Sequence, residues 1–122
     1  MVEDHPDTLN FLCLYLEGSG HEVQCASTLA ESLEAIPKAN CDVLICDVGL
    51  PDGDGWQLLA QLKKANHPHP AYAIVMSGFG TLSDRSKSAA AGYRHHILKP
   101  FNPRELGQML QEAAAEAKSR ED

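Results

Sequence analysis

Short aliphatic runs alternate along the chain with longer segments in which apolar residues recur three and four positions apart. The short runs are typical of buried β-strands, and the longer segments of amphipathic helices. The clearest strands are expected at Asp42–Cys46 and Ala71–Met76, because nearly continuous apolar runs suit strands covered by helices on both faces. Weaker strands are expected at His21–Cys25 and Tyr93–Leu98, and a two-residue stub begins the chain.

Helical stripes of apolar residues separate these strands, and another helix is expected at Leu82–Ala91. The stripes are Leu9, Leu12 and Leu16; Leu29, Leu33 and Ile36; Leu58, Leu59 and Leu62; and Leu106, Met109, Leu110 and Ala113. Thr28 with Glu31 predicts a capping box, and Asn102 predicts an N-cap. Regular alternation without a linker or repeat predicts one doubly wound α/β domain over residues 1–122.

The first strand is short for its place in such a domain. A central parallel strand normally has about five residues, but only Met1 and Val2 precede the acidic pair Glu3 and Asp4. We therefore expect that the chain is cut at its start from something longer.

The composition limits the binding partners and the cellular location that are expected for this domain. The 10 basic and 17 acidic side chains give a net charge of -7, which opposes direct binding to nucleic acid or anionic lipid. We find no signal peptide and no apolar run of membrane-spanning length, so a cytoplasmic domain without membrane insertion is expected. The cysteines form no CxxC pair and are expected to be reduced and buried: Cys13, Cys25, Cys41 and Cys46.

Reactive side chains follow the expected strands. Glu3 and Asp4 follow the stub, and Asp47, Ser77 and Lys99 follow three later strands. In an open parallel sheet, ligands bind beyond the carboxyl ends of the strands. Clustered carboxylates repel one another unless a cation neutralises them, and Mg²⁺ prefers oxygen ligands. A carboxylate beside such a metal can attack a phosphoryl group, with a lysine and a hydroxyl on the other phosphoryl oxygens.

These residues carry a resemblance that extends over essentially the whole chain. Val2-Glu3-Asp4, Cys46-Asp47-Val48-Gly49-Leu50-Pro51-Asp52-Gly53, Ser77-Gly78 and Lys99-Pro100-Phe101 are similar to motifs of the response-regulator receiver family. The resemblance implies a five-stranded parallel sheet in the order 2-1-3-4-5, flanked by five helices. The sequence around Gly49 and Ser77 is most similar to that of receivers attached to hybrid sensor histidine kinases.

The resemblance also implies a phosphoacceptor and a metal site. Asp47 is expected to accept the phosphoryl group, and Asp4 and Asp47 to bind Mg²⁺ or Mn²⁺ directly. Glu3 is expected to act through water, and the Gly49 backbone carbonyl to be a third direct ligand.

Further residues are expected to contact or respond to the phosphoryl group. Ser77 and Lys99 match the family's phosphoryl contacts, and the Lys99-Pro100 peptide is expected to be cis. The family usually has Tyr or Phe three residues before the lysine as a switch, but this chain has His96 there. A histidine at that position could make switching depend on pH.

The resemblance implies a function in two-component signalling or a phosphorelay. The expected donor is the phosphohistidine of a histidine kinase or histidine phosphotransfer domain, and no turnover of an external substrate is expected. The fourth helix, fifth strand and fifth helix are expected to allow weak dimerisation.

Other functions remain open as alternatives. One is a receiver-like interaction module that works without phosphorylation. An aspartyl phosphatase would need an acid where Gly49 lies, and a flavodoxin-like carrier would need a phosphate loop where Glu3, Asp4 and His5 lie.

Overall fold

The computed structural model of the chain describes residues 1–39, 41–65, 70, 72–78, 82–99 and 102–121. The helices are α1 (Pro6–Gly18), α2 (Leu29–Ala39), α3 (Gly55–Lys64), α4 (Leu82–Ala91) and α5 (Pro103–Glu121). The strands are β1 (Val43–Asp47), β2 (Gly49–Leu50), β3 (Gly53–Asp54), β4 (Tyr72–Ser77) and β5 (His95–Leu98). β2 and β3 form a small antiparallel pair directly after β1.

The main sheet is parallel and has the order β1-β4-β5 among the described residues. Val2 continues it beyond β1 through isolated parallel bridges to Cys46 and Ala26. Ala26, Val2, β1, β4 and β5 therefore lie side by side in that order. This matches the predicted order 2-1-3-4-5, with Ala26 and Val2 at the first two places and β1, β4 and β5 as its third, fourth and fifth strands, and it confirms the predicted fold class.

The predicted strand at His21–Cys25 is wrong, because the structure assigns no strand to those residues. Only Ala26, one residue further on, bridges to Val2. A strand needs a partner along its length, and here the partner ends at Met1. The predicted strand at Tyr93–Leu98 is confirmed, although it begins at His95.

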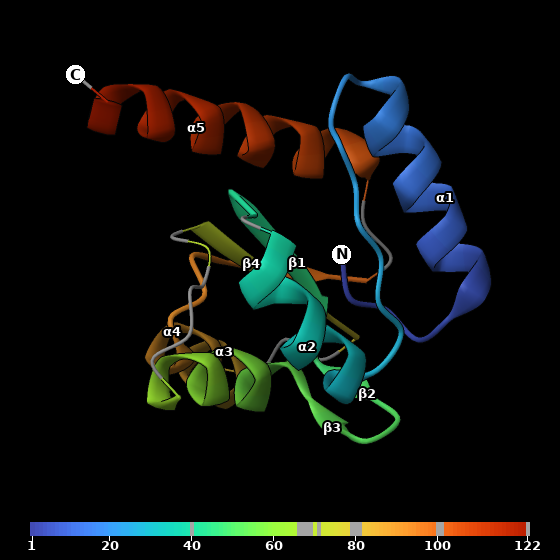
Figure 1. Cartoon of the computed structure of the whole chain (residues 1–122), viewed down its shortest axis with the longest axis vertical. Coiled ribbons are helices and arrows are strands. Elements are labelled where there is room, and N and C mark those ends of the chain that lie inside the picture. Colours follow the sequence, from blue (N-terminus) through green and yellow to red (C-terminus); the bar gives the residue numbers. More distant parts are fainter. Residues whose placement is uncertain (40, 66–69, 71, 79–81, 100–101, 122) are drawn as a thin grey trace.

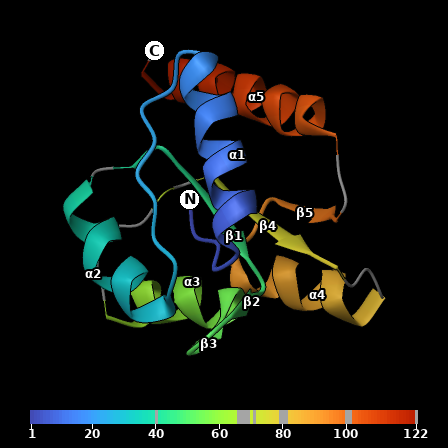
Figure 2. The ribbon, with the colours of Figure 1, turned by 90° about the vertical axis from the view of Figure 1, so that its right-hand side faces the viewer.

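Helices cover both faces of the sheet (Figure 1). α1 and α5 lie on one face and α2, α3 and α4 on the other, and a view turned by 90° shows the same layers (Figure 2). Each face has its own apolar core. The α2 side includes Val2, Leu44, Cys46, Leu58, Leu59 and Val75, and the α1 side includes Leu12, Leu16, Ile45, Ile74, Met76 and Leu110. Every residue of β4 is buried, as expected for a central strand.

Two residues of the loop that follows β1 cap helices and so fix this loop in place. Asp54 caps α3 by accepting from the Gln57 N–H at 2.8 Å, and the Gln57 side chain accepts from the Asp54 N–H at 3.1 Å. Asp52 caps α2, since its carboxylate accepts from the Leu29 N–H at 2.7 Å. These caps hold the segment that follows Asp47 against two helices.

The predicted cap of α2 at Thr28 is confirmed in part. The Thr28 hydroxyl accepts from the Glu31 N–H at 3.0 Å. The Glu31 carboxylate, however, accepts from the Ser27 N–H at 3.1 Å, one residue before the expected position.

Three of the four cysteines depart from the prediction, because Cys13 and Cys25 are not reduced and Cys41 is only half-buried. Cys13 on α1 and Cys25 form a disulfide, while Cys41 and Cys46 are free. Cys25 is also exposed. The prediction failed because this proximity is tertiary: the chain turns after α1 and returns beside it. No helix of the described residues is long and apolar enough to cross a membrane.

Candidate acidic site at the carboxyl edge of the sheet

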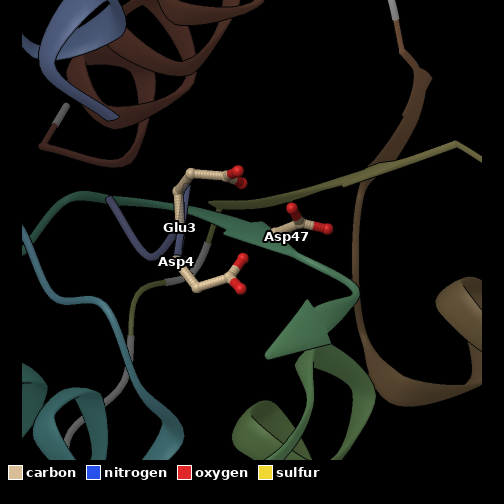
Figure 3. A group of neighbouring side chains, drawn as sticks. All are labelled: Glu3, Asp4 and Asp47. Carbon is tan, nitrogen blue, oxygen red and sulfur yellow. The ribbon is translucent and has the colours of Figure 1, made fainter. Parts of the chain in front are cut away.

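Backbone pairing brings the acidic residues together. The Val2 N–H donates to the Ile45 carbonyl at 2.8 Å, and the Asp47 N–H donates to the Val2 carbonyl at 2.8 Å. Glu3 and Asp4, which follow Val2, therefore lie beside Asp47 at the end of β1. Figure 3 shows the three carboxylates pointing toward one another.

Three carboxylate oxygens, one each from Glu3, Asp4 and Asp47, all lie within 4.8 Å of one another. Glu3 is almost completely buried at 1% exposure and Asp47 is 9% exposed, whereas Asp4 faces solvent. The site is therefore open on the Asp4 side and closed beneath Glu3. A small hydrated cation suits such a site, because it can keep waters on its open side.

Lys99 supplies the positive charge that faces this cluster. Its Nζ lies 2.5 Å from Asp47 Oδ2 and 3.1 Å from Glu3 Oε2. The Lys99 N–H donates to the Ser77 carbonyl at 2.8 Å, which fixes the residue at the end of β5. The other Asp47 oxygen, Oδ1, accepts from the Gly49 N–H at 3.1 Å.

Burial and neighbouring charges shift the pKa values of Glu3 and Asp47 in opposite directions. Burial, together with its hydrogen bond to Asp47, raises the pKa of Glu3 to about 7, and Lys99 only partly offsets this. Burial also opposes ionisation of Asp47, but hydrogen bonds with Glu3, Lys99 and Gly49 outweigh it and lower the pKa of Asp47. The same two acids outweigh the burial of Lys99 and raise its pKa. Asp47 is therefore the ionised member of the pair.

The raised pKa of Glu3 predicts a pH dependence of stability without metal. An acid whose pKa is higher in the folded state contributes stability at low pH, and that contribution is lost as pH rises through the folded value. We expect the urea midpoint of the wild type to fall, relative to Glu3→Gln, between about pH 4.5 and about pH 7. The measurement is urea unfolding of both proteins in chelator. Parallel pH profiles would show that Glu3 ionises normally.

The cluster fits a divalent metal by its chemistry. Among the described residues it is the only group of three or more His, Cys, Asp or Glu side chains close enough to hold one ion. All three donors are carboxylates, which Mg²⁺ and Mn²⁺ prefer. Lys99 already offsets part of their charge, so a bound cation and Lys99 would compete for the same oxygens.

The remaining predicted site residues have separate outcomes. Ser77 is buried at 3% exposure at the end of β4, one residue beyond Met76, which pairs with Asp47. The Gly49 N–H donates to the Asp47 carboxylate, and metal binding by the Gly49 carbonyl stays a prediction. Pro100, and with it the predicted cis peptide, lies outside the described residues.

His96 is half-buried and belongs to a hydrogen-bonded relay between elements. Its Nδ1 lies 2.9 Å from the Ser88 hydroxyl of α4. The same hydroxyl accepts from the indole N–H of Trp56 on α3 at 2.8 Å and donates to the Asp84 carbonyl at 3.1 Å. Sequence reasoning missed Ser88, because a serine on a predicted helix gives no sign of a partner 32 residues away.

A doubly wound α/β domain with carboxylates facing a lysine at the carboxyl ends of its parallel strands defines a class of signalling domain. The chain belongs to the family described as the response regulator receiver domain, whose model matches residues 1–111. This confirms the family expected from the motifs.

Solved structures and curated relatives agree with this family. The structure is similar to the CheY-like response regulator receiver domain protein from Methanospirillum hungatei, with a TM-score of 0.87, 30% identity and coverage of 98% of this chain and 94% of that one. The chain is 34% identical to the KDP operon transcriptional regulatory protein KdpE of Escherichia coli, over 93% of this chain and 49% of KdpE. It is 33% identical to the transcriptional regulatory protein PmrA of Pectobacterium parmentieri, over 87% of this chain and 47% of PmrA. The chain thus spans about half the length of these regulators.

Proposed function

We propose that this receiver domain accepts a phosphoryl group on Asp47 from a phosphohistidine, with Mg²⁺ or Mn²⁺ bound by the acidic cluster. The donor would be a histidine kinase or a histidine phosphotransfer domain. The observation that carries the proposal is the convergence of three carboxylates and Lys99 on one point at the end of β1. The ion pair between Asp47 and Lys99 supports the proposal, because a carboxylate that could act as the nucleophile lies beside a cationic group.

The two oxygens of Asp47 have different surroundings. Gly49 holds Oδ1 through its N–H, so Oδ2, which faces Lys99, is the oxygen that would attack phosphorus. A bond forms between Oδ2 and phosphorus while the phosphorus–nitrogen bond of the donor breaks, and the electron pair leaves with the imidazole nitrogen. The products are an aspartyl phosphate and an unmodified histidine.

Lys99 and Ser77 would hold the transferred group. As Oδ2 becomes part of the acyl phosphate, the Lys99 ammonium would lose one of its two carboxylate partners and move to a phosphoryl oxygen. The Ser77 hydroxyl, at the end of the neighbouring strand, would donate to another oxygen. The bound divalent cation would supply charge neutralisation for the carboxylates and the phosphoryl oxygens.

Each domain would be modified once and would not turn over an external substrate, because its own side chain is the acceptor. The net charge of -7 favours output through protein contacts rather than direct nucleic-acid binding, in a cytoplasmic setting. Attachment to a hybrid sensor kinase stays a prediction, since the two curated relatives above are named as transcriptional regulators.

The response would reach a partner through α4 and β5. Ser77 is the last residue of β4, the strand that precedes α4 in the chain, and His96 lies on β5 with its ring against Ser88 of α4. Movement of Ser77 toward the phosphoryl group would shift α4 and disturb the relay that joins Trp56, Ser88 and His96. The surface of α4, β5 and α5 would then bind a partner or a second copy weakly.

The relay predicts that Trp56, the single tryptophan, reports the switch. In the wild type we expect its fluorescence to change on phosphorylation. Ser88→Ala removes the hydroxyl shared by Trp56 and His96, so this change should disappear while phosphoryl incorporation persists. Loss of one such hydrogen bond should also lower stability by about 1 kcal/mol. Ser88→Thr, which keeps the hydroxyl, is the matched control, and an undiminished response in Ser88→Ala would exclude the relay.

Incubation with acetyl phosphate tests the proposed function. We expect the intact mass to rise by one phosphoryl group in Mg²⁺ and to stay unchanged in chelator. No gain in a folded, Mg²⁺-containing sample would contradict the proposal and favour an interaction module that works without phosphorylation.

A further inference from the structure

Basic side chains gather on two neighbouring helices of this acidic chain. Residues 55–92, which include α3 and α4, hold four of the 10 basic side chains and one of the 17 acidic ones. This part therefore carries a net charge of +3, whereas the remaining residues, with six basic and 16 acidic side chains, carry a net charge of -10. All four basic side chains are exposed, and we call them the basic α3–α4 surface: Lys63, Lys64, Arg85 and Lys87.

The basic α3–α4 surface forms no ion pair within the part of the chain that the structure describes. Elsewhere in that part, Lys38, Arg94 and Lys99 each pair with a glutamate or an aspartate of this chain. The sequence of α3 contains no acidic residue, and Asp84 is the one acidic residue of α4. The positive charge of this surface is therefore available to a partner.

Two ammonium groups of this surface are held where α3 and α4 pack together on one face of the sheet (Figures 1 and 2). The Lys87 Nζ of α4 lies 5.2 Å from the centre of the Trp56 ring of α3. The Lys63 Nζ of α3 donates to the Ala91 carbonyl at the end of α4, at 3.4 Å. Gly92 makes room for this contact, because a Cβ at that position would overlap the Lys63 ammonium. An ammonium that is already held loses less conformational entropy when it binds a carboxylate.

Alanine side chains lie between these two ammonium groups. Trp56, Ala60 and Lys63 are four and three positions apart, so they share the face of α3 that borders α4. On α4, Ala90 follows Lys87 by three positions, and both Ala60 and Ala90 are exposed. Trp56 and Lys63 are about 10 Å apart along the helix axis, a length that about three residues of an extended chain span. A short segment can therefore approach both helices closely and reach both ammonium groups.

We propose that the basic α3–α4 surface binds a short acidic segment of a protein partner, with carboxylates on Lys63 and Lys87. A short segment fits the distribution of charge, because it meets the net charge of +3 on these helices and avoids the net charge of -10 on the rest of the chain. A nucleic acid or an anionic lipid surface would extend beyond the two helices and be repelled there. The site is separate from the acidic cluster, and binding to it needs no phosphoryl group.

The test titrates the full chain with hexaglutamate at low ionic strength, with hexaglutamine as the uncharged control. We expect hexaglutamate alone to shift the backbone amide signals of α3 and α4 in NMR spectra in a saturable manner, and to change the fluorescence of Trp56 in the wild type. Combining Lys63→Gln with Lys87→Gln should weaken the affinity measured by NMR by about fivefold or more, because two surface ion pairs are lost. Combining Lys38→Gln with Arg104→Gln is the matched control, since it removes the same charge from exposed residues of α2 and α5. It should leave the affinity within about twofold of the wild-type value.

Equal weakening in the two double variants would overturn the proposal, because net charge rather than this surface would then attract the peptide. The absence of saturable shifts on α3 and α4 would also overturn it. Tighter binding of hexathymidylate than of hexaglutamate at the same lysines would do so as well, since the surface would then be a site for phosphate groups. These titrations are made without phosphoryl donor or metal, so their outcome stands apart from the test of phosphoryl transfer.

Discussion

Asp47→Asn is expected to abolish phosphoryl incorporation from acetyl phosphate in Mg²⁺. The amide lacks the anionic oxygen that would attack phosphorus, and removal of a nucleophile of this kind costs a factor on the order of 10³ or more in rate. The fold should survive, because Asn is nearly isosteric and its side-chain oxygen can still accept from the Gly49 N–H. The measurement is the time course of intact mass, together with far-ultraviolet circular dichroism to confirm folding.

Asp52→Asn provides a matched control for that experiment. Asp52 is five positions away, on the loop that follows β1, and its carboxylate caps α2 rather than joining the acidic cluster. It should keep phosphoryl incorporation near the wild-type rate. Equal incorporation in Asp47→Asn and wild type would mean that another residue accepts the phosphoryl group.

Lys99→Ala is expected to impair both stability and phosphoryl incorporation. Without the ammonium, Glu3 and Asp47 face each other with no cation, and the loss of a half-buried charged partner costs about 1–3 kcal/mol. The loss of stability should be smaller at about pH 5 than at about pH 8. At about pH 5 Glu3 is protonated, so Asp47 is the one member of the pair that carries a charge. Urea unfolding in chelator at the two pH values measures the effect.

Mg²⁺ should restore much of the stability of Lys99→Ala, because a divalent cation can neutralise the same carboxylates. It should not restore phosphoryl incorporation, which needs a cation on the transferred group as well. Lys99→Arg keeps the charge and serves as the control for stability. A variant as stable as the wild type in chelator at both pH values would show that Lys99 does not neutralise the pair.

The acidic site could be predicted because its residues follow strands. The carboxyl ends of parallel strands meet at one edge of the sheet, so Glu3, Asp47 and Lys99 come together although 96 positions separate the first and the last. Apolar runs before Asp47 and Lys99 marked two of these strand ends, whereas only the two-residue stub precedes Glu3.

Other features depended on contacts that no local pattern marks. The Cys13–Cys25 disulfide joins α1 to a segment without regular structure, and the relay from Trp56 through Ser88 to His96 crosses three elements. The failed strand at residues 21–25 is different, because its residues suit a strand but its partner is too short. The lack of a pairing partner, rather than a low strand propensity, explains why that segment forms no strand.

The most direct test of the central claim is to locate the phosphoryl group within the chain. After phosphorylation in Mg²⁺, borohydride would reduce an aspartyl phosphate to homoserine, and peptide mass spectrometry would identify the modified position. Homoserine at position 47, absent when acetyl phosphate or Mg²⁺ is omitted, is the predicted result. Homoserine at another position, or a modification that resists borohydride, would contradict the assignment of Asp47 as the acceptor.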